Sequence, residues 1–289
     1  MSPKINYMKT FTMKTLVITI MTLLSLNIYS QDYNYNDNKG KFYIYWGWNR
    51  GYYSDSDIRF KGDGYDFTIK DVSAHDRQTP VAFDPYITEM TIPQTNFRLG
   101  YFINDHYDIS IGVDHMKYIM TQDQAVNIYG NINNGSDFDG TYNGEEIILT
   151  EDFLMFEHTD GLNYVNIEVN RNDNIFGLLK MKVNPDKIQL NTVGGVGVGI
   201  LYPKTNTTLM GFDRYDEFHV AGYGFSGKIG LNLTLFKYFF IQTEGKVGYI
   251  NMPDIRTTQS KTDKAQQDFM FFSNNITFGA KFRLWNNKK

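Results

Sequence analysis

The sequence predicts an all-β fold, a transmembrane antiparallel up-and-down β-barrel of about eight strands with long extracellular loops. Three observations predict it: an N-terminus typical of exported proteins, repeated segments in which apolar and polar residues alternate, and connections that alternate between short and long. The mean hydropathy of −0.40 argues against a helical membrane protein. It does not argue against a barrel, because the two faces of an alternating strand average out.

Residues 1–30 have the features of a cleaved signal peptide. An apolar run over residues 16–28 ends just before Ser30, a small residue suited to cleavage, and follows three lysines, Lys4, Lys9 and Lys14. A membrane-spanning helix needs about 20 apolar residues, more than this run supplies. The alternative is a buried N-terminal helix, which the polar residues that follow disfavour. We expect residues 31–40 to form a short periplasmic lead.

Alternation with a period of two dominates the chain from residue 41 onward. Between residues 221 and 235, apolar side chains take the odd positions, and Gly, Ser, Lys, Asn and Thr take the even ones, with Gly227 as the one exception. A strand places each set on its own face, whereas a helix would scatter both sets. The same pattern recurs in segments near 41–51, 97–103, 107–114, 165–170, 195–200, 239–249 and 276–284. Together with residues 221–235, these segments give about eight strands.

The connections between these segments alternate in length. Tight turns are predicted at Asn104-Asp105 and around Lys237, and a link of middle length is predicted near residues 172–187. The other connections are long and polar, at residues 52–93, 120–157, 203–218 and 252–267. Short turns at one end and long loops at the other are the arrangement of outer-membrane barrels. We therefore expect a barrel over residues 41–285 and a periplasmic tail at 286–289.

Alternation alone does not say which face points inward. A soluble lipocalin-like barrel is apolar inside, whereas a membrane barrel is apolar outside. Here glycines crowd the polar face, which suits a narrow lumen better than a water-exposed surface. That face also carries both signs of charge, which can pair inside a barrel. We expect the following charged residues in the interior: Arg98, Asp108, Glu168, Lys228, Glu244, Lys246, Lys281 and Arg283.

The last strand ends in Phe282-Arg283-Leu284-Trp285, which resembles the C-terminal aromatic signal read by the outer-membrane assembly machinery. Residues 41–285 as a whole resemble the outer-membrane β-barrel domain proteins common in Bacteroidetes, and the architecture is similar to that of the small OmpX- and OmpA-type barrels. Three segments carry the family resemblance: 46–50, 60–67 and 156–164. The resemblance implies a Gram-negative outer-membrane location, with membrane lipid and the assembly machinery as partners. It implies no activity.

Composition excludes several kinds of function. The 289 residues include no cysteine, which excludes disulfides, thiolate metal sites and a cysteine nucleophile. The net charge is −4, so nothing points to nucleic acid. No phosphate-binding loop or metalloprotease motif occurs, and no cofactor is expected. Because an eight-stranded barrel is filled by its own side chains, we expect a non-enzymatic function in the surface loops: binding a surface protein or glycan, or a role in envelope structure.

The sharpest candidate for chemistry is His158-Thr159-Asp160. The alternative function is therefore a lipid A-modifying enzyme, an acyl hydrolase or acyltransferase, in which His158 acts as the base and Asp160 orients it. His158 and Asp160 share one face of a regular strand, whereas Thr159 points to the other face. His115 and His75 lie in segments that would allow them to join His158, but their spacing is not diagnostic of a metal site.

Two further segments stand out in the predicted loops. Asp137, Asp139, Asn143 and Glu145 give fragments of a calcium-binding pattern without the EF-hand spacing, and a solvated acidic loop is the preferred interpretation. Residues 58–69 alternate around Gly62-Asp63-Gly64, which predicts a hairpin that stands in the first long loop.

Overall fold

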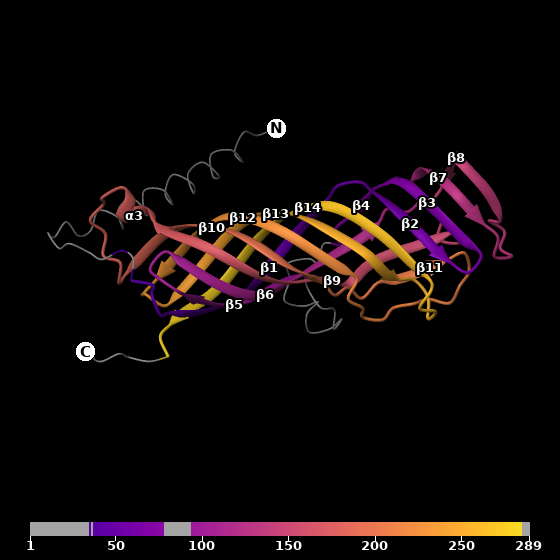
Figure 1. Ribbon diagram of the computed structural model, residues 1–289. Coiled ribbons are helices and arrows are strands. Elements are labelled where there is room, and N and C mark those ends of the chain that lie inside the picture. The colour runs from indigo at the N-terminus through magenta and orange to yellow at the C-terminus, as the bar shows by residue number, and fades with distance from the viewer. Residues whose placement is uncertain (1–34, 36, 78–93, 285–289) are drawn as a thin grey trace, which may run out of the picture.

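The computed structural model describes residue 35 and residues 37–77 and 94–284, so the predicted signal peptide and C-terminal tail lie outside the described residues. Eight antiparallel strands close into a barrel (Figure 1), which confirms the predicted fold class. In ring order they are β1 (Phe42–Tyr53), β5 (Thr95–Phe102), β6 (Tyr107–Met120), β9 (Leu154–Asn174), β10 (Ile188–Leu201), β12 (Gly222–Leu235), β13 (Phe239–Arg256) and β14 (Lys264–Phe282). The ring is closed by β1 and β14, with Trp46 opposite Phe278.

Short turns join neighbouring strands at one end of the barrel. Between β12 and β13, Phe236 and Lys237 adopt φ values of 52° and 67°, the left-handed conformation of a tight hairpin turn. Between β5 and β6, the side chain of Asn104 accepts hydrogen bonds from the backbone N–H groups of His106 and Tyr107, both at 2.8 Å. The middle-length link carries one short helix, α3 (Ile175–Leu178).

Four more strands lengthen the barrel wall at the opposite end. The first residues of β14 pair with β2 (Ser56–Gly62), and the sheet continues through β3 (Tyr65–Val72), β7 (Ala125–Ile132) and β8 (Gly140–Ile148). β2 and β3 form the predicted hairpin. Two short strands complete this end: β4 (Ala74–His75) pairs with β6, and β11 (Asn206–Leu209) pairs with β9. Figure 1 shows β2, β3, β7 and β8 at the far end of the barrel from α3. The long connections lie at this end, which is the extracellular one.

The polarity of the barrel interior changes along its axis. In β6, the inward side chains near the short-turn end are Asp108, Ser110 and Asp114, all buried. Further along the same strand and on the same face, the inward side chains become Met116, Tyr118 and Met120. β14 changes in the same way, from Lys281, Thr277 and Asn275 to Phe271 and Phe269.

The outward face shows which half lies in lipid. Around the half of the barrel nearest α3, large apolar side chains point outward and are exposed: Ile44, Leu99, Ile111, Ile167, Val198, Phe225, Ile241 and Phe278. A continuous apolar surface of this kind is unfavourable in water and is covered by hydrocarbon in a transmembrane barrel. The described residues include no helix long and apolar enough to cross a membrane.

The extracellular half is built like a soluble protein. Its buried core is apolar and includes Ile58, Phe60, Phe67, Tyr118, Phe156, Met252 and Phe269. Much of the sequence predicted as loop at 120–157 and 252–267 is therefore strand. The predicted strands were too short because the alternation reverses where the strands leave the membrane. Apolar residues occupy the outward-facing positions in the membrane-spanning half and the inward-facing positions beyond it.

Candidate functional site

Paired charges fill the lumen of the membrane-spanning half. The Glu168 carboxylate receives three cations, with Arg98 Nη2 at 3.0 Å and the Nζ atoms of Lys228 and Lys246 both at 2.7 Å. Lys246 also lies 2.6 Å from Asp114, and Lys228 lies 3.1 Å from Glu244. All of these side chains are buried. The network therefore pairs the carboxylates of Asp114, Glu168 and Glu244 with Arg98, Lys228 and Lys246 inside the lumen, which offsets the cost of burying these charges.

The remaining predicted interior charges divide into two groups. Asp108 and Lys281 are buried in the lumen, where Asp108 accepts a hydrogen bond from the Tyr43 hydroxyl at 2.7 Å and Lys281 lies 5.5 Å from the ring centre of Phe102. Arg283 does not lie in the lumen. β14 ends at Phe282, so the alternation no longer fixes where the next side chain points, and Arg283 is exposed and pairs with Asp37 at 2.7 Å.

Close packing seals the lumen beside these charges. A methyl group placed on Gly100 would lie 2.1 Å from the Tyr43 ring, so the wall and the ring are already in contact. The space left between Asp108, Lys228 and Lys281 is about 10 Å³, close to the least that a single water molecule needs. Side chains therefore fill the lumen of the membrane-spanning half, as expected for an eight-stranded barrel.

His158 lies in the apolar core of the extracellular half, beyond the lipid-facing residues of β9. Its ring stands between Tyr118 and Phe156, with ring centres 5.5 and 5.1 Å away, and its Nδ1 lies 2.9 Å from the Thr205 hydroxyl. The side chain has no exposed surface, and burial lowers the pKa of the imidazole to about 3. A neutral ring enclosed by aromatic groups stabilises the core and cannot reach a lipid substrate.

The three predicted catalytic residues are not brought together. A β-bulge interrupts the pairing of β6 with β9 between Met116 and Tyr118, and Gly161 takes a φ of 130°. The regular alternation is lost here, so His158 points inward while Asp160 is exposed and pairs with Lys204 at 3.3 Å. The prediction that His158 and Asp160 share a face is therefore wrong. The Thr159 hydroxyl donates to Glu157 at 3.0 Å, whereas the ring of His158 is bonded to Thr205.

The other candidate ligands are also separate. His115 Nδ1 lies 2.7 Å from Asn163, and His75 Nδ1 lies 3.4 Å from the Thr121 hydroxyl. Within residues 37–77 and 94–284, no three His, Asp or Glu side chains are close enough to hold one metal ion.

The acidic segment is a set of local turn contacts. The Asp139 carboxylate accepts hydrogen bonds from the backbone N–H groups of Asn134 and Gly135, at 2.9 and 3.0 Å, which closes the β7–β8 turn. Glu145 accepts the backbone N–H of Asn143, and Asp137 is exposed. These contacts define the predicted acidic loop as hairpin structure.

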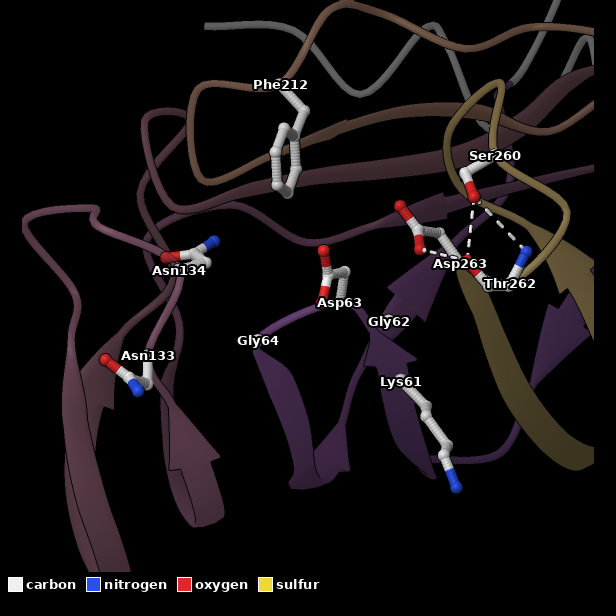
Figure 2. Close-up of a pocket in the computed structure, with 10 residues that line it drawn as sticks. All are labelled: Lys61, Gly62, Asp63, Gly64, Asn133, Asn134, Phe212, Ser260, Thr262 and Asp263. Carbon is white, nitrogen blue, oxygen red and sulfur yellow. Dashed lines mark hydrogen bonds between the residues drawn. The ribbon is translucent and has the colours of Figure 1, made fainter.

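A pocket opens where four extracellular connections meet, as Figure 2 shows. Its volume is about 910 Å³, and its lining comes from the β2–β3 turn, the β7–β8 turn, the loop that follows β11 and the β13–β14 loop: Lys61, Gly62, Asp63, Gly64, Asn133, Asn134, Phe212, Ser260, Thr262 and Asp263. We call this hollow the tip pocket. It lies at the end of the sheet extension, beyond the apolar core of the extracellular half.

Local hydrogen bonds hold the walls of the tip pocket in place. The two hairpin turns are joined by the backbone N–H of Asn133, which donates to the Gly64 carbonyl at 2.7 Å. On the opposite wall, the Asp263 carboxylate accepts the hydroxyls of Thr258 and Thr262, at 2.8 and 3.0 Å. The Gly62-Asp63-Gly64 turn is predictable from the sequence, but the pocket is not, because its four segments are far apart in the chain and no periodicity links them.

These features define the class: a closed eight-stranded transmembrane β-barrel with a filled lumen and a structured extracellular extension. Among solved structures, the chain is similar to the outer membrane protein OprG from Pseudomonas aeruginosa, at 13% identity over 86% of this chain and 99% of that one, with a TM-score of 0.36. It is also similar to the outer membrane protein AlkL, at 11% identity over 91% of this chain and 99% of that one, with a TM-score of 0.40. A third similar structure is Neisserial surface protein A, at 11% identity over 84% of this chain and 100% of that one, with a TM-score of 0.33. No family model and no curated protein matches the sequence.

Proposed function

We propose that this chain is a non-enzymatic outer-membrane protein of a Gram-negative bacterium that displays a binding site at the cell surface. Export by the signal peptide and insertion by the outer-membrane assembly machinery would place the apolar band in membrane lipid. The Bacteroidetes outer-membrane barrel family indicated by the motifs at 46–50, 60–67 and 156–164 fits this proposal. The site would take a surface protein or a glycan as its partner.

One observation carries the proposal: among the described residues, a large polar-lined pocket lies at the tip, whereas the lumen is filled. The membrane-spanning half is filled by ion pairs around Glu168, whereas the tip pocket has a volume of about 910 Å³. A pocket of this size is within the range of ligand sites, about 300–1,000 Å³. A rigid scaffold that holds loops toward solvent is a common arrangement for binding.

The geometry does not favour the lipid A-modifying alternative. His158 is enclosed in the core, and Asp160 faces solvent. An acyl transfer or hydrolysis needs a base and its orienting group within hydrogen-bond reach of one another.

Surface labelling tests the location and the direction of the chain together. An epitope inserted after Gly135, in the exposed β7–β8 turn, should be detected by antibody on intact cells. The protein should sediment with the outer membrane and change its gel mobility on boiling, as folded barrels do. An epitope detected only after the cells are opened would contradict the proposal. So would full-length protein in the soluble fraction.

A further inference from the structure

We infer that the tip pocket binds a neutral oligosaccharide, with one sugar ring seated on Phe212 and its hydroxyls bonded by Asp63, Asn134 and Asp263. This inference rests on the proposed surface-binding function and names the chemistry of the ligand. Three properties of the pocket lead to it: its polar groups, its aromatic wall and its charge.

The polar groups of the pocket suit a ligand rich in hydroxyls. The Asp63 carboxylate makes no hydrogen bond within the part of the chain that the structure describes, so it is free to bond a ligand. The Asn134 amide faces the same hollow in Figure 2, and its Nδ2 lies 3.9 Å from the Met210 sulfur. A carboxylate accepts two hydrogen bonds side by side, and an amide both donates and accepts. Adjacent sugar hydroxyls offer donors and acceptors with that spacing. Figure 2 shows Asp63, Asn134 and Asp263 around one hollow.

Phe212 supplies an apolar face for the ring of a sugar. Its side chain stands above Asp63 in Figure 2, and about a third of it (36%) is exposed. The preceding residues Met210 and Gly211 have φ values of 48° and 79°, and the backbone N–H of Phe212 donates to the Leu209 carbonyl at 2.9 Å. This turn and the ring of Tyr65, 6.2 Å away, fix Phe212 before any ligand binds. The negative face of an aromatic ring attracts the positively polarised C–H groups of a sugar.

The charge of the pocket selects neutral over acidic sugars. Asp63 and Asp263 are both carboxylates on the pocket wall. Among the lining residues that the structure describes, the one cation is Lys61, which lies 3.9 Å from Asp66 on the outer side of the hairpin and whose side chain is 60% exposed. A sulfated or carboxylated sugar would therefore meet negative charge without a compensating cation, which is unfavourable.

The test uses the full-length protein in lipid nanodiscs and a panel of neutral and acidic oligosaccharides. At least one neutral oligosaccharide should bind, and the acidic ones should not. Phe212→Ala should weaken that binding about tenfold, the loss expected for one aromatic contact. As a separate single variant, Asp63→Ala should cause a larger loss. Phe218→Ala is the matched control, because Phe218 is an exposed aromatic residue of the same loop that stacks on Tyr202 outside the pocket. Unchanged heat-dependent gel mobility would show that each variant folds.

Two results separate this inference from the proposed function. If only acidic glycans or a surface protein bind, and Phe212→Ala weakens that binding, the inference of a neutral oligosaccharide is wrong but the proposed surface-binding function stands. If no ligand of any class depends on Phe212 or Asp63, both are wrong. Equal losses for Phe212→Ala and Phe218→Ala would also overturn the inference, because the pocket would then have no special role.

Discussion

The Glu168 carboxylate lies 2.7 Å from Lys246 Nζ in the middle of the lumen, and both side chains are buried. β9 and β13, which carry them, are separated in the ring by β10 and β12, so the ion pair connects two non-adjacent strands through the lumen. Arg98 and Lys228 contact the same carboxylate. Glu168 therefore binds cations from three strands other than its own: β5, β12 and β13.

The first prediction concerns this shared anion. Glu168→Gln removes one charge and leaves Arg98, Lys228 and Lys246 close together with fewer counter-ions. Breaking a buried ion pair from one side costs about 3–5 kcal/mol, so we expect a loss of that order in the free energy of unfolding. Urea titration in lipid vesicles, followed by gel mobility, measures it. Ile167→Leu, one residue away on the lipid-facing side, is the control and should change little. An equal midpoint for both variants would show that the network does not stabilise the barrel.

The second prediction tests the lipid-facing band. Ile111 is 55% exposed and lies in the apolar band. Ile111→Arg should therefore cost about 2–4 kcal/mol, the penalty for a cation on the lipid face near the membrane centre. Tyr129→Arg is the comparison, because Tyr129 is similarly exposed, at 45%, but lies on β7 in the extracellular extension. If both substitutions cost the same free energy, the band is not covered by lipid.

The third prediction is a pH dependence of the extracellular half. Burial lowers the pKa of His158 to about 3 in the folded protein, against about 6.5 in an unfolded chain. Between these values the unfolded state binds the additional proton, so stability falls as the pH drops below about 6.5. At pH 5 the loss should be about 2 kcal/mol. Limited proteolysis of the extension at pH 7 and pH 5 would detect this loss.

His158→Gln provides the control for that experiment. Glutamine has no titrating group, so the variant should lose most of the difference in protease resistance between pH 7 and pH 5, although its stability at pH 7 can be lower. If the difference persists unchanged in His158→Gln, another group is responsible for it.

The fourth prediction concerns the packed lumen. A single methyl group on Gly100 would lie 2.1 Å from the Tyr43 ring. That ring cannot move away freely, because its hydroxyl donates to Asp108 at 2.7 Å. Gly100→Val should therefore lower stability by about 1–3 kcal/mol through overpacking. The double variant with Tyr43→Ser should recover part of the loss in the same urea titration. No recovery would mean that the strain arises elsewhere.

The sequence predicted the barrel well because one physical rule, alternation, governs the whole membrane-spanning half. The parity that places Ile109 and Ile111 outward also places Asp108 and Ser110 inward, and all four positions agree with the structure. Between Asp114 and Met116 the inward-facing residues change from polar to apolar, and there the prediction ended the strand too early. The prediction also placed Arg283 wrongly, because alternation does not determine the direction of a side chain beyond the last paired residue of a strand.

The candidate site was harder to predict than the fold. His158 and Asp160 looked like partners only while β9 was treated as regular, and the bulge opposite Lys117 removed that relation. The tip pocket depends on four connections that meet through tertiary structure. Its Phe212 and Asp263 are about 50 residues apart and carry no local signal.

β14 extends without interruption from the tip of the extension, where it pairs with β2, to the short-turn end, where it pairs with β1. A force applied at the tip is therefore carried along this strand. The force is then shared in shear among many backbone hydrogen bonds, so no single pair of residues has to resist it alone. β14 thus couples the extracellular extension mechanically to the membrane-spanning half.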